Sequence, residues 1–169
     1  MSKLYTVLNG AVAGAAAPVK VSTGTAIKTM IQLATNATNN AIRIKQWWCE
    51  FDGSTAATPI EVELVGHTTG PVTTLTAYNA ADVAKVNDPN APATSLQLGA
   101  ALSGYTATAE VTPTGTVRNI ESHLVPPTGG ILIQYPLGQE PEVPVNAFLR
   151  VRVTAGAAVF AYIGVTFEE

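Results

Sequence analysis

The sequence predicts an all-β protein: an antiparallel β-sandwich of jelly-roll-like strand order with an N-terminal extended arm. Apolar and polar residues alternate at period two in at least five segments, and no segment sustains a helical period. Turn residues, including many of the 14 glycines and 11 prolines, recur at the spacing typical of β-sandwiches. Thr and Val are abundant, and both favour half-buried pleated surfaces. Because strand order is not visible in a sequence, an immunoglobulin-like sandwich is the alternative.

Residues 1–25 are predicted to form an arm that precedes a single domain at 26–169. The segment is rich in Ala, Gly and Val, contains Pro18 and shows no strong alternation, so it should contribute little to a core. Ordering such an arm costs about 1–2 kcal/mol of backbone entropy per residue, which pockets on a neighbouring subunit must offset. The interface candidates in the arm are its bulky residues, Leu4, Tyr5, Val7 and Leu8. The alternative makes this segment the first strand of the sandwich.

The strands of the domain follow from alternation. They are expected, in chain order, at 26–34, 41–51, 59–65, 105–111, 117–125, 131–135, 147–153 and 159–167. In the second of them, Ile42 and Ile44 alternate with basic residues. The parity then changes, and the apolar positions become Trp47, Cys49 and Phe51. Either a β-bulge re-aims this strand, or its second half is covered on both faces.

Trp47 and Trp48 are adjacent, so in a strand they point to opposite faces of the sheet. One of them therefore belongs to the core, and the other is a surface or interface anchor. Trp47 is taken as the interface candidate.

The segment at about 66–98 alternates poorly and is predicted to be a long surface excursion, with one or two helical turns at 79–86. Such excursions in compact domains are often functional. Tyr78 is therefore a further interface candidate.

Composition and spacing argue against catalysis and several classes of partner. Only 12% of residues are charged and the net charge is −3, with no basic cluster to hold nucleic acid. No apolar run is long enough to span a membrane, and the single Cys49 excludes an internal disulfide. His67 and His123 lie far apart without partners at ligand spacing, so no metal site, cofactor or catalytic residue is expected. The protein is predicted not to be an enzyme.

A surface of small uncharged side chains suits a protein that is packed into an assembly. Five segments also carry a resemblance to a known family: Trp48–Ser54, Ala57–Leu64, Val125–Gly130, Gln134–Glu140 and Val165–Glu169. The similarity extends over roughly residues 41–169, and on these segments the chain resembles head decoration proteins (minor capsid or cement proteins) of tailed bacteriophages.

The resemblance implies a structural virion protein on the outer surface of the capsid. There, homotrimers at local three-fold positions would bind the major capsid protein and clamp neighbouring capsomers against the pressure of the packaged DNA. The alternative is a carbohydrate- or receptor-binding sandwich of a phage tail or fibre. That alternative needs aromatic side chains grouped on one exposed face, for which the candidates are Trp47, Tyr78, Tyr105 and Tyr135.

Overall fold

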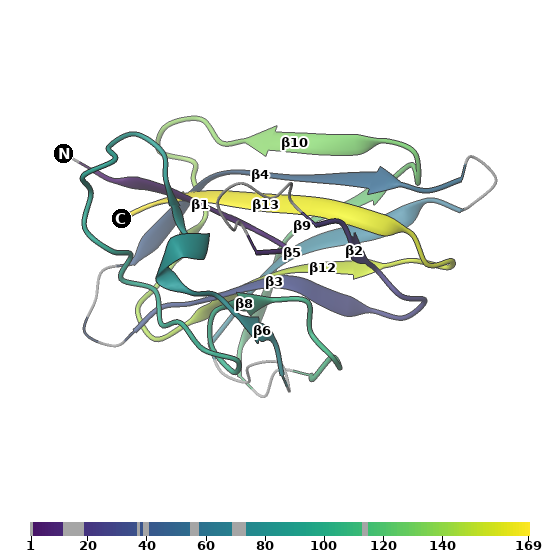
Figure 1. Ribbon diagram of the computed structural model, residues 1–169, viewed down its shortest axis with the longest axis horizontal. Helices are drawn as coiled ribbons and strands as arrows, with labels where there is room; N and C mark the ends of the chain where they lie inside the picture. Colours follow the sequence, from purple (N-terminus) through teal and green to yellow (C-terminus); the bar gives the residue numbers. More distant parts are fainter. Residues whose placement is uncertain are drawn as a thin grey trace.

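Two antiparallel sheets pack face to face in the computed structural model (Figure 1), which describes residues 2–11, 19–36, 38, 41–54, 58–68, 74–112 and 115–169. The strands are β1 (Leu4–Leu8), β2 (Val21–Ser22), β3 (Lys28–Ala34), β4 (Ile42–Asp52), β5 (Ile60–His67), β6 (Thr76–Ala77), β7 (Ala84–Lys85), β8 (Gly104–Tyr105), β9 (Val117–Val125), β10 (Gly130–Gln134), β11 (Glu142–Val143), β12 (Phe148–Thr154) and β13 (Phe160–Glu168). The helical structure in the described residues is one 3-10 turn, η1 (Ala80–Asp82). None of these residues forms a helix with the length and apolar character needed to cross a membrane.

The longer strands pair in jelly-roll order. Sheet A has the order β10-β4-β13-β1-β7, and sheet B has the order β6-β8-β3-β12-β5-β9. β1 pairs with β13, β3 with β12, β4 with β10 and β5 with β9, all of them antiparallel. The two halves of the chain thus pair along their length as one antiparallel ribbon, which folds over at the β5–β9 pair. Before this pair and after it, successive long strands lie alternately in sheet A and sheet B. This pairing confirms the predicted jelly-roll-like sandwich over the immunoglobulin-like alternative.

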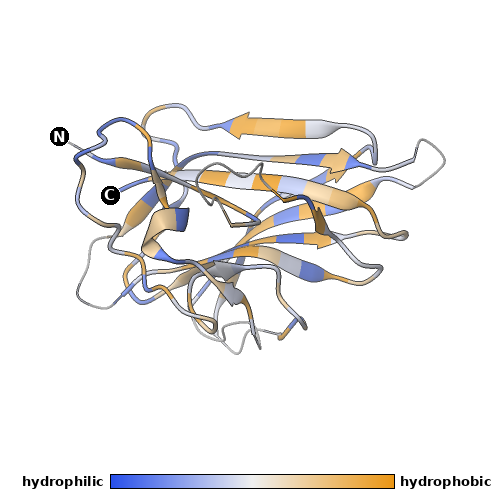
Figure 2. Ribbon diagram, in the orientation of Figure 1, coloured by the Kyte–Doolittle hydropathy of each residue, from blue (hydrophilic) through white to orange (hydrophobic). Residues whose placement is uncertain are grey.

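The inner faces of both sheets supply the core, as the alternation predicted. Along β12, Leu149, Val151 and Val153 are buried, and on the neighbouring β5 so are Val62 and Leu64. Figure 2 shows hydrophobic and hydrophilic residues alternating in bands along the long strands. Burying one such side chain stabilises the fold by about 1.5–3 kcal/mol relative to leaving it in water. Many such side chains share one core, so their burial is the main source of its stability.

A β-bulge explains the change of parity in β4. Thr166 of β13 pairs with Gln46 and the next residue, Phe167, pairs with Ile44, so Lys45 is an extra residue in β4. The bulge lets the apolar side chains on both sides of it face the core. Of the two interpretations of this strand, the bulge is the correct one.

The prediction that residues 1–25 form an arm outside the domain is wrong for their first part. β1 lies between β13 and β7 in sheet A, with Tyr5 opposite Phe167. The interface candidates of this segment are buried in the protein's own core or half-buried: Tyr5, Val7 and Leu8 are buried, and Leu4 is half-buried. The chain later returns to the same sheet in β2, which pairs with β13. Residues 12–18 lie outside the described residues.

The described part of the 66–98 excursion closes one side of the sandwich, and we call it the wall segment. Within it, β6 pairs with β8, which lies after the excursion in the chain and pairs with β3 of sheet B, while β7 pairs with β1 of sheet A. The segment thus connects the two sheets along one side. Tyr78 lies inside this wall, 2% exposed, and its hydroxyl donates a hydrogen bond to Leu8 O at 2.6 Å. Tyr78 is therefore a core residue, and its selection as an interface candidate is wrong. The helical turns expected at 79–86 reduce to η1, which is followed directly by Val83 and β7.

Replacing Tyr5 by Ala tests whether β1 belongs to the core. The Tyr5 ring stacks on Phe167 with centroids 5.7 Å apart, and its hydroxyl donates to Pro92 O at 3.1 Å. We expect Tyr5→Ala to lower the free energy of unfolding by about 3–5 kcal/mol, measured by urea denaturation. Leu4→Ala, at the neighbouring half-buried position, should cost less. If Tyr5→Ala were as stable as the unchanged protein, β1 would be a dispensable arm.

Candidate functional site

No group of three or more metal-binding side chains comes together in the part of the chain that the structure describes. His67 is buried and stacks on Phe148 at a centroid distance of 5.0 Å. His123 lies elsewhere, on β9, with its Nε2 3.2 Å from a carboxylate oxygen of Glu121. Burial raises the pKa of the Cys49 thiol to about 12, so this thiol stays protonated at neutral pH and is a poor nucleophile.

Trp47 is a core residue whose indole nitrogen reaches a small polar cluster. Its Nε1 donates to Glu121 Oε2 at 3.2 Å and to the Tyr135 hydroxyl at 3.1 Å. Burial, and then the hydrogen bond to Glu121, raise the pKa of Tyr135. Trp47 itself has no exposed surface, so its selection as an interface candidate is wrong. Glu121 and His123 stand on β9, the edge of sheet B, where a buried or half-buried charge discourages pairing with a further strand.

A buried arginine ties the loop between β8 and β9 to sheet B. The Arg150 side chain on β12 has no exposed surface, and its Nη1 donates to Glu110 Oε1 at 2.8 Å and to Val111 O at 3.0 Å. Burial lowers the pKa of the Arg150 guanidinium, and the Glu110 carboxylate opposes that shift. The other oxygen of Glu110 accepts a hydrogen bond from Thr29 Oγ1 at 2.6 Å. This cluster holds a covering segment in place and leaves no open site.

A second ion cluster holds the bulge of β4. Lys45 Nζ lies 2.8 Å from Glu140 Oε1 and also contacts the Glu168 carboxylate. The hydrogen bond from Lys45 lowers the pKa of Glu140 to about 2, and a hydrogen bond from the same ammonium lowers the pKa of Glu168. Only 4% of the Glu140 side chain is exposed. The pair therefore fastens the loop after β10 onto β4.

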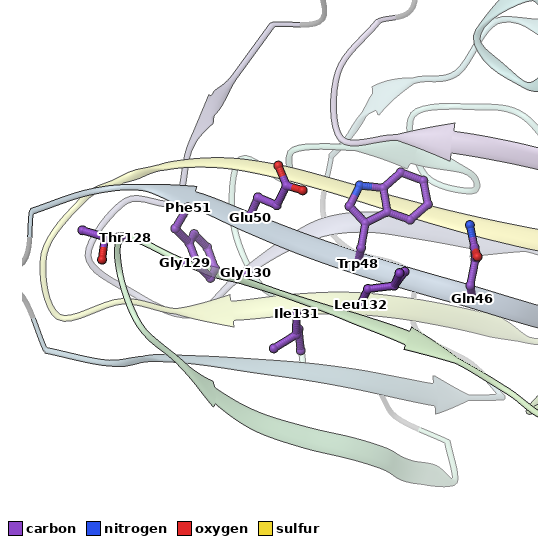
Figure 3. Close-up of a pocket in the computed structure, with 9 residues that line it drawn as sticks. All are labelled: Gln46, Trp48, Glu50, Phe51, Thr128, Gly129, Gly130, Ile131 and Leu132. Atoms are coloured by element: carbon purple, nitrogen blue, oxygen red, sulfur yellow. The ribbon is translucent and has the colours of Figure 1, made fainter.

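An exposed group of unlike side chains lies on the outer face of sheet A, over β4 and β10 (Figure 3). An open depression of about 680 Å³ is lined there by Gln46, Trp48, Glu50 and Leu132, together with the turn between β9 and β10. Trp48 is half-buried, and Glu50 is exposed. Gln134 Nε2 donates to Gln46 Oε1 at 2.8 Å across the two strands. An aromatic ring, a carboxylate and two amides thus share one face.

Two glycines on the neighbouring strands set how Trp48 and Glu50 lie. A Cβ placed at Gly164 of β13 would be 2.1 Å from Cζ2 of Trp48, so the indole leans over β13 at a position that has no side chain. A Cβ at Gly130 of β10 would be 2.6 Å from Cys49 O and 2.9 Å from Cγ of Glu50, so the glycine lets β10 approach β4 closely beside Glu50. Gly164 therefore gives the indole room over β13, and Gly130 permits the close approach of β10 to β4.

A further exposed region is the side of the sandwich where β9 and β10 form the edges of their sheets. Leu124 on β9 is 74% exposed, Leu132 on β10 is 58% exposed, and Leu137 in the following turn is 92% exposed. β10 has no charged residue, no proline and no break in its register with β4, although such features usually protect an edge strand. We call this region the β9–β10 side.

No protein-family model, curated protein or solved structure matches this chain. A function for this protein therefore has to be inferred from its own surfaces. The four aromatic residues expected on one exposed face lie in the core or pack against it: Trp47, Tyr78, Tyr105 and Tyr135. Sequence reasoning missed the exposed or half-exposed set: Trp48, Glu50, Leu124, Leu132 and Leu137. One signal was present for Trp48, because the parity shared by Trp47, Cys49 and Phe51 already turns Trp48 outward.

Removing the carboxylate that faces Arg150 should destabilise the protein strongly. Glu110→Ala leaves the buried guanidinium uncompensated, which typically costs about 3–5 kcal/mol. We expect urea denaturation to show a loss of this size. Glu61→Ala, an exposed position on β5 of the same sheet, should change stability by less than about 0.5 kcal/mol. A small effect of Glu110→Ala would mean that this cluster does not hold the loop between β8 and β9.

The ion cluster at Lys45 should make stability depend on pH under acidic conditions. The pKa of Glu140 is about 2 in the folded protein, against about 4.3 in an unfolded chain. Its contribution is therefore complete above about pH 4.5 and is lost as the pH falls toward 2. We expect the melting temperature to drop across this window, and Glu140→Gln to flatten the drop.

Glu142→Gln is the matched control, because the Glu142 carboxylate is half-exposed and lies 3.7 Å from Arg43. This variant should keep the acid-dependent drop. If Glu140→Gln had the same pH profile as the unchanged protein, the cluster would not contribute to stability.

Proposed function

We propose that the protein decorates the outer surface of a tailed-phage capsid, where it binds the major capsid protein as a homotrimer and clamps neighbouring capsomers. The resemblance of five segments to head decoration proteins supports this role. The observation that carries it is the β9–β10 side, where the edge strands of the two sheets and the turn after β10 carry three exposed leucines. A surface of this kind suits a protein partner.

The leucines give this side its binding potential. Moving an exposed leucine such as Leu124 or Leu137 from water into an interface contributes about 2 kcal/mol. The uncharged strand β10 adds backbone groups along an edge that no strand of the described chain pairs with, and an extended segment of a neighbour can bind them. In a capsid lattice, modest contacts of this size repeat in each subunit and act together.

A cyclic trimer fits an edge of this type. Each subunit of such a ring binds the next through two different surfaces, so the β9–β10 side need not be complementary to itself. The other described edge of sheet A is β7, a strand of two residues, Ala84 and Lys85, within the wall segment. The longer edge strands, β9 and β10, lie on the opposite side. In the proposed trimer, each subunit therefore presents this side to its neighbour.

Charged substitutions on the β9–β10 side test the proposal. Light scattering of the unchanged protein should give about three times 17.5 kDa. The double variant Leu124→Asp with Leu137→Asp should fold normally by circular dichroism, fail to trimerise and bind decoration-free capsids more weakly in a co-sedimentation assay.

Val86→Asp is the control, since Val86 is 54% exposed but follows β7 at the other edge of sheet A. It should leave both the mass and the capsid binding unchanged. If the double variant kept the mass and the capsid binding of the unchanged protein, docking through the β9–β10 side would be wrong. If the unchanged protein did not bind capsids at all, the decoration role would be wrong.

A further inference from the structure

We propose that the outer face of sheet A binds a polysaccharide of equatorially linked pyranose rings, with Trp48 as the stacking platform and Glu50 as a hydroxyl acceptor. This activity goes beyond the structural role and does not depend on it. The site lies over β4, and Leu132 borders both surfaces, whereas Leu124 and Leu137 of the β9–β10 side lie outside the depression. A decoration protein with such a site would link the virion to a polysaccharide surface.

The indole of Trp48 lies flat on the sheet. A Cβ at Gly164 would be 2.1, 2.4 and 2.5 Å from Cζ2, Cη2 and Cε2, three consecutively bonded ring atoms. The near-equality of these distances places that Cβ over the face of the ring, because an approach along the ring edge would leave the two flanking atoms much farther away. One face of the indole is thus turned toward β13 and the other away from the sheet. Figure 3 shows the ring projecting from β4 across β13.

A flat aromatic ring suits the C–H face of a pyranose. That face is apolar, carries slightly positive hydrogens and matches the negative face of an indole. Sugars also need hydrogen-bonding groups at the rim of the ring, since their hydroxyls otherwise lose water without compensation. A site for them therefore combines one or two rings with acceptors and donors a few ångströms away.

The depression supplies these polar groups beside Trp48. Glu50 is exposed, and its carboxylate accepts hydrogen bonds only, which suits sugar hydroxyls. Gln46 and Gln134 are joined by one hydrogen bond of 2.8 Å, and each amide has further donor and acceptor capacity for a ligand. Gly130, on β10 opposite Glu50, adds no side chain to the floor of the depression.

The shape and charge of the face select the ligand class. The depression is open and lies on a flat sheet, so it suits a ribbon-like chain more than a sugar enclosed at one end. β-1,4-linked polymers of glucose or N-acetylglucosamine are extended ribbons with flat C–H faces, whereas α-1,4-linked polymers coil. Nucleic-acid bases also stack on indoles. The Glu50 carboxylate and the net charge of −3 repel the phosphates that such a ligand carries.

Trp48 has a structural use that must be separated from binding. An aromatic ring beside a glycine stabilises a sheet, so Trp48 also protects Gly164. That use alone predicts a change in melting temperature after Trp48→Ala and no interaction of any variant with a polysaccharide. Binding therefore has to be measured directly.

Affinity electrophoresis in native gels tests the site, with hydroxyethylcellulose, glycol chitin or soluble starch in the gel. We expect the unchanged protein to be retarded by at least one of the two β-1,4-linked polymers and not by starch. Trp48→Ala should weaken the interaction at least about tenfold. Gly164→Ala keeps the indole but displaces it, and should weaken binding as well. Phe160→Ala is the matched control, since Phe160 is a 53% exposed aromatic residue on β13 that does not line the depression.

Three results would overturn the proposal. They are no retardation by either β-1,4-linked polymer, equal retardation of Trp48→Ala and the unchanged protein, and starch retarding the protein as strongly as the other polymers. The double variant Leu124→Asp with Leu137→Asp should be retarded like the unchanged protein even when it fails to trimerise. Its result separates a failure of the polysaccharide site from a failure of the decoration role.

Discussion

The bulge at Lys45 fixes which side chains of the longest strand are buried, and both faces of sheet A depend on it. The register that buries Ile44 would turn Trp47 to the solvent if β4 continued without the extra residue, because a shift of one residue exchanges the two faces. Lys45 stays at its place because Glu140 and Glu168 bind its ammonium from the loop after β10 and from β13. A largely covered ion pair, beside an otherwise apolar strand, thus sets the packing of the core.

The same register builds the outer surface. Once Trp47 is inward, Trp48 and Glu50 are outward, and each contacts a position on a neighbouring strand that is occupied by glycine. A larger residue at Gly164 would lift the indole from β13, and one at Gly130 would collide with the backbone of β4 as well as with Glu50. The surface over β4 is therefore specified by contacts between strands that are distant in sequence, as firmly as the core beneath it is.

Alternation was enough to predict the sandwich, its long strands and the change of parity in β4, because period two reports directly on burial. It did not predict β1, since the partner that buries Tyr5 is Phe167 at the other end of the chain and the intervening segment gives no sign of that pairing. The N-terminal segment does need pockets for its bulky side chains to offset the backbone entropy lost on ordering. Those pockets lie in this chain's own core and not on a neighbouring subunit. Tyr78 was misplaced for a related reason: its wall segment is ordered by the two sheet edges that it joins. For Trp48 the parity was visible, but its contact with Gly164 is a cross-strand property that no local pattern contains.

The scarcity of charge takes on a physical meaning once the ion pairs are placed. Each of three pairs fastens a connecting segment to a strand: Lys3 with Asp88, Lys45 with Glu140, and Arg150 with Glu110. These charges pair with one another within the same chain. Much of the remaining outer surface consists of Thr, Ala, Gly and a few apolar residues. A weakly charged surface is a disadvantage for a free chain in solution, where charge opposes association. It is an advantage in a packed layer, because few ions have to leave water when neighbours meet.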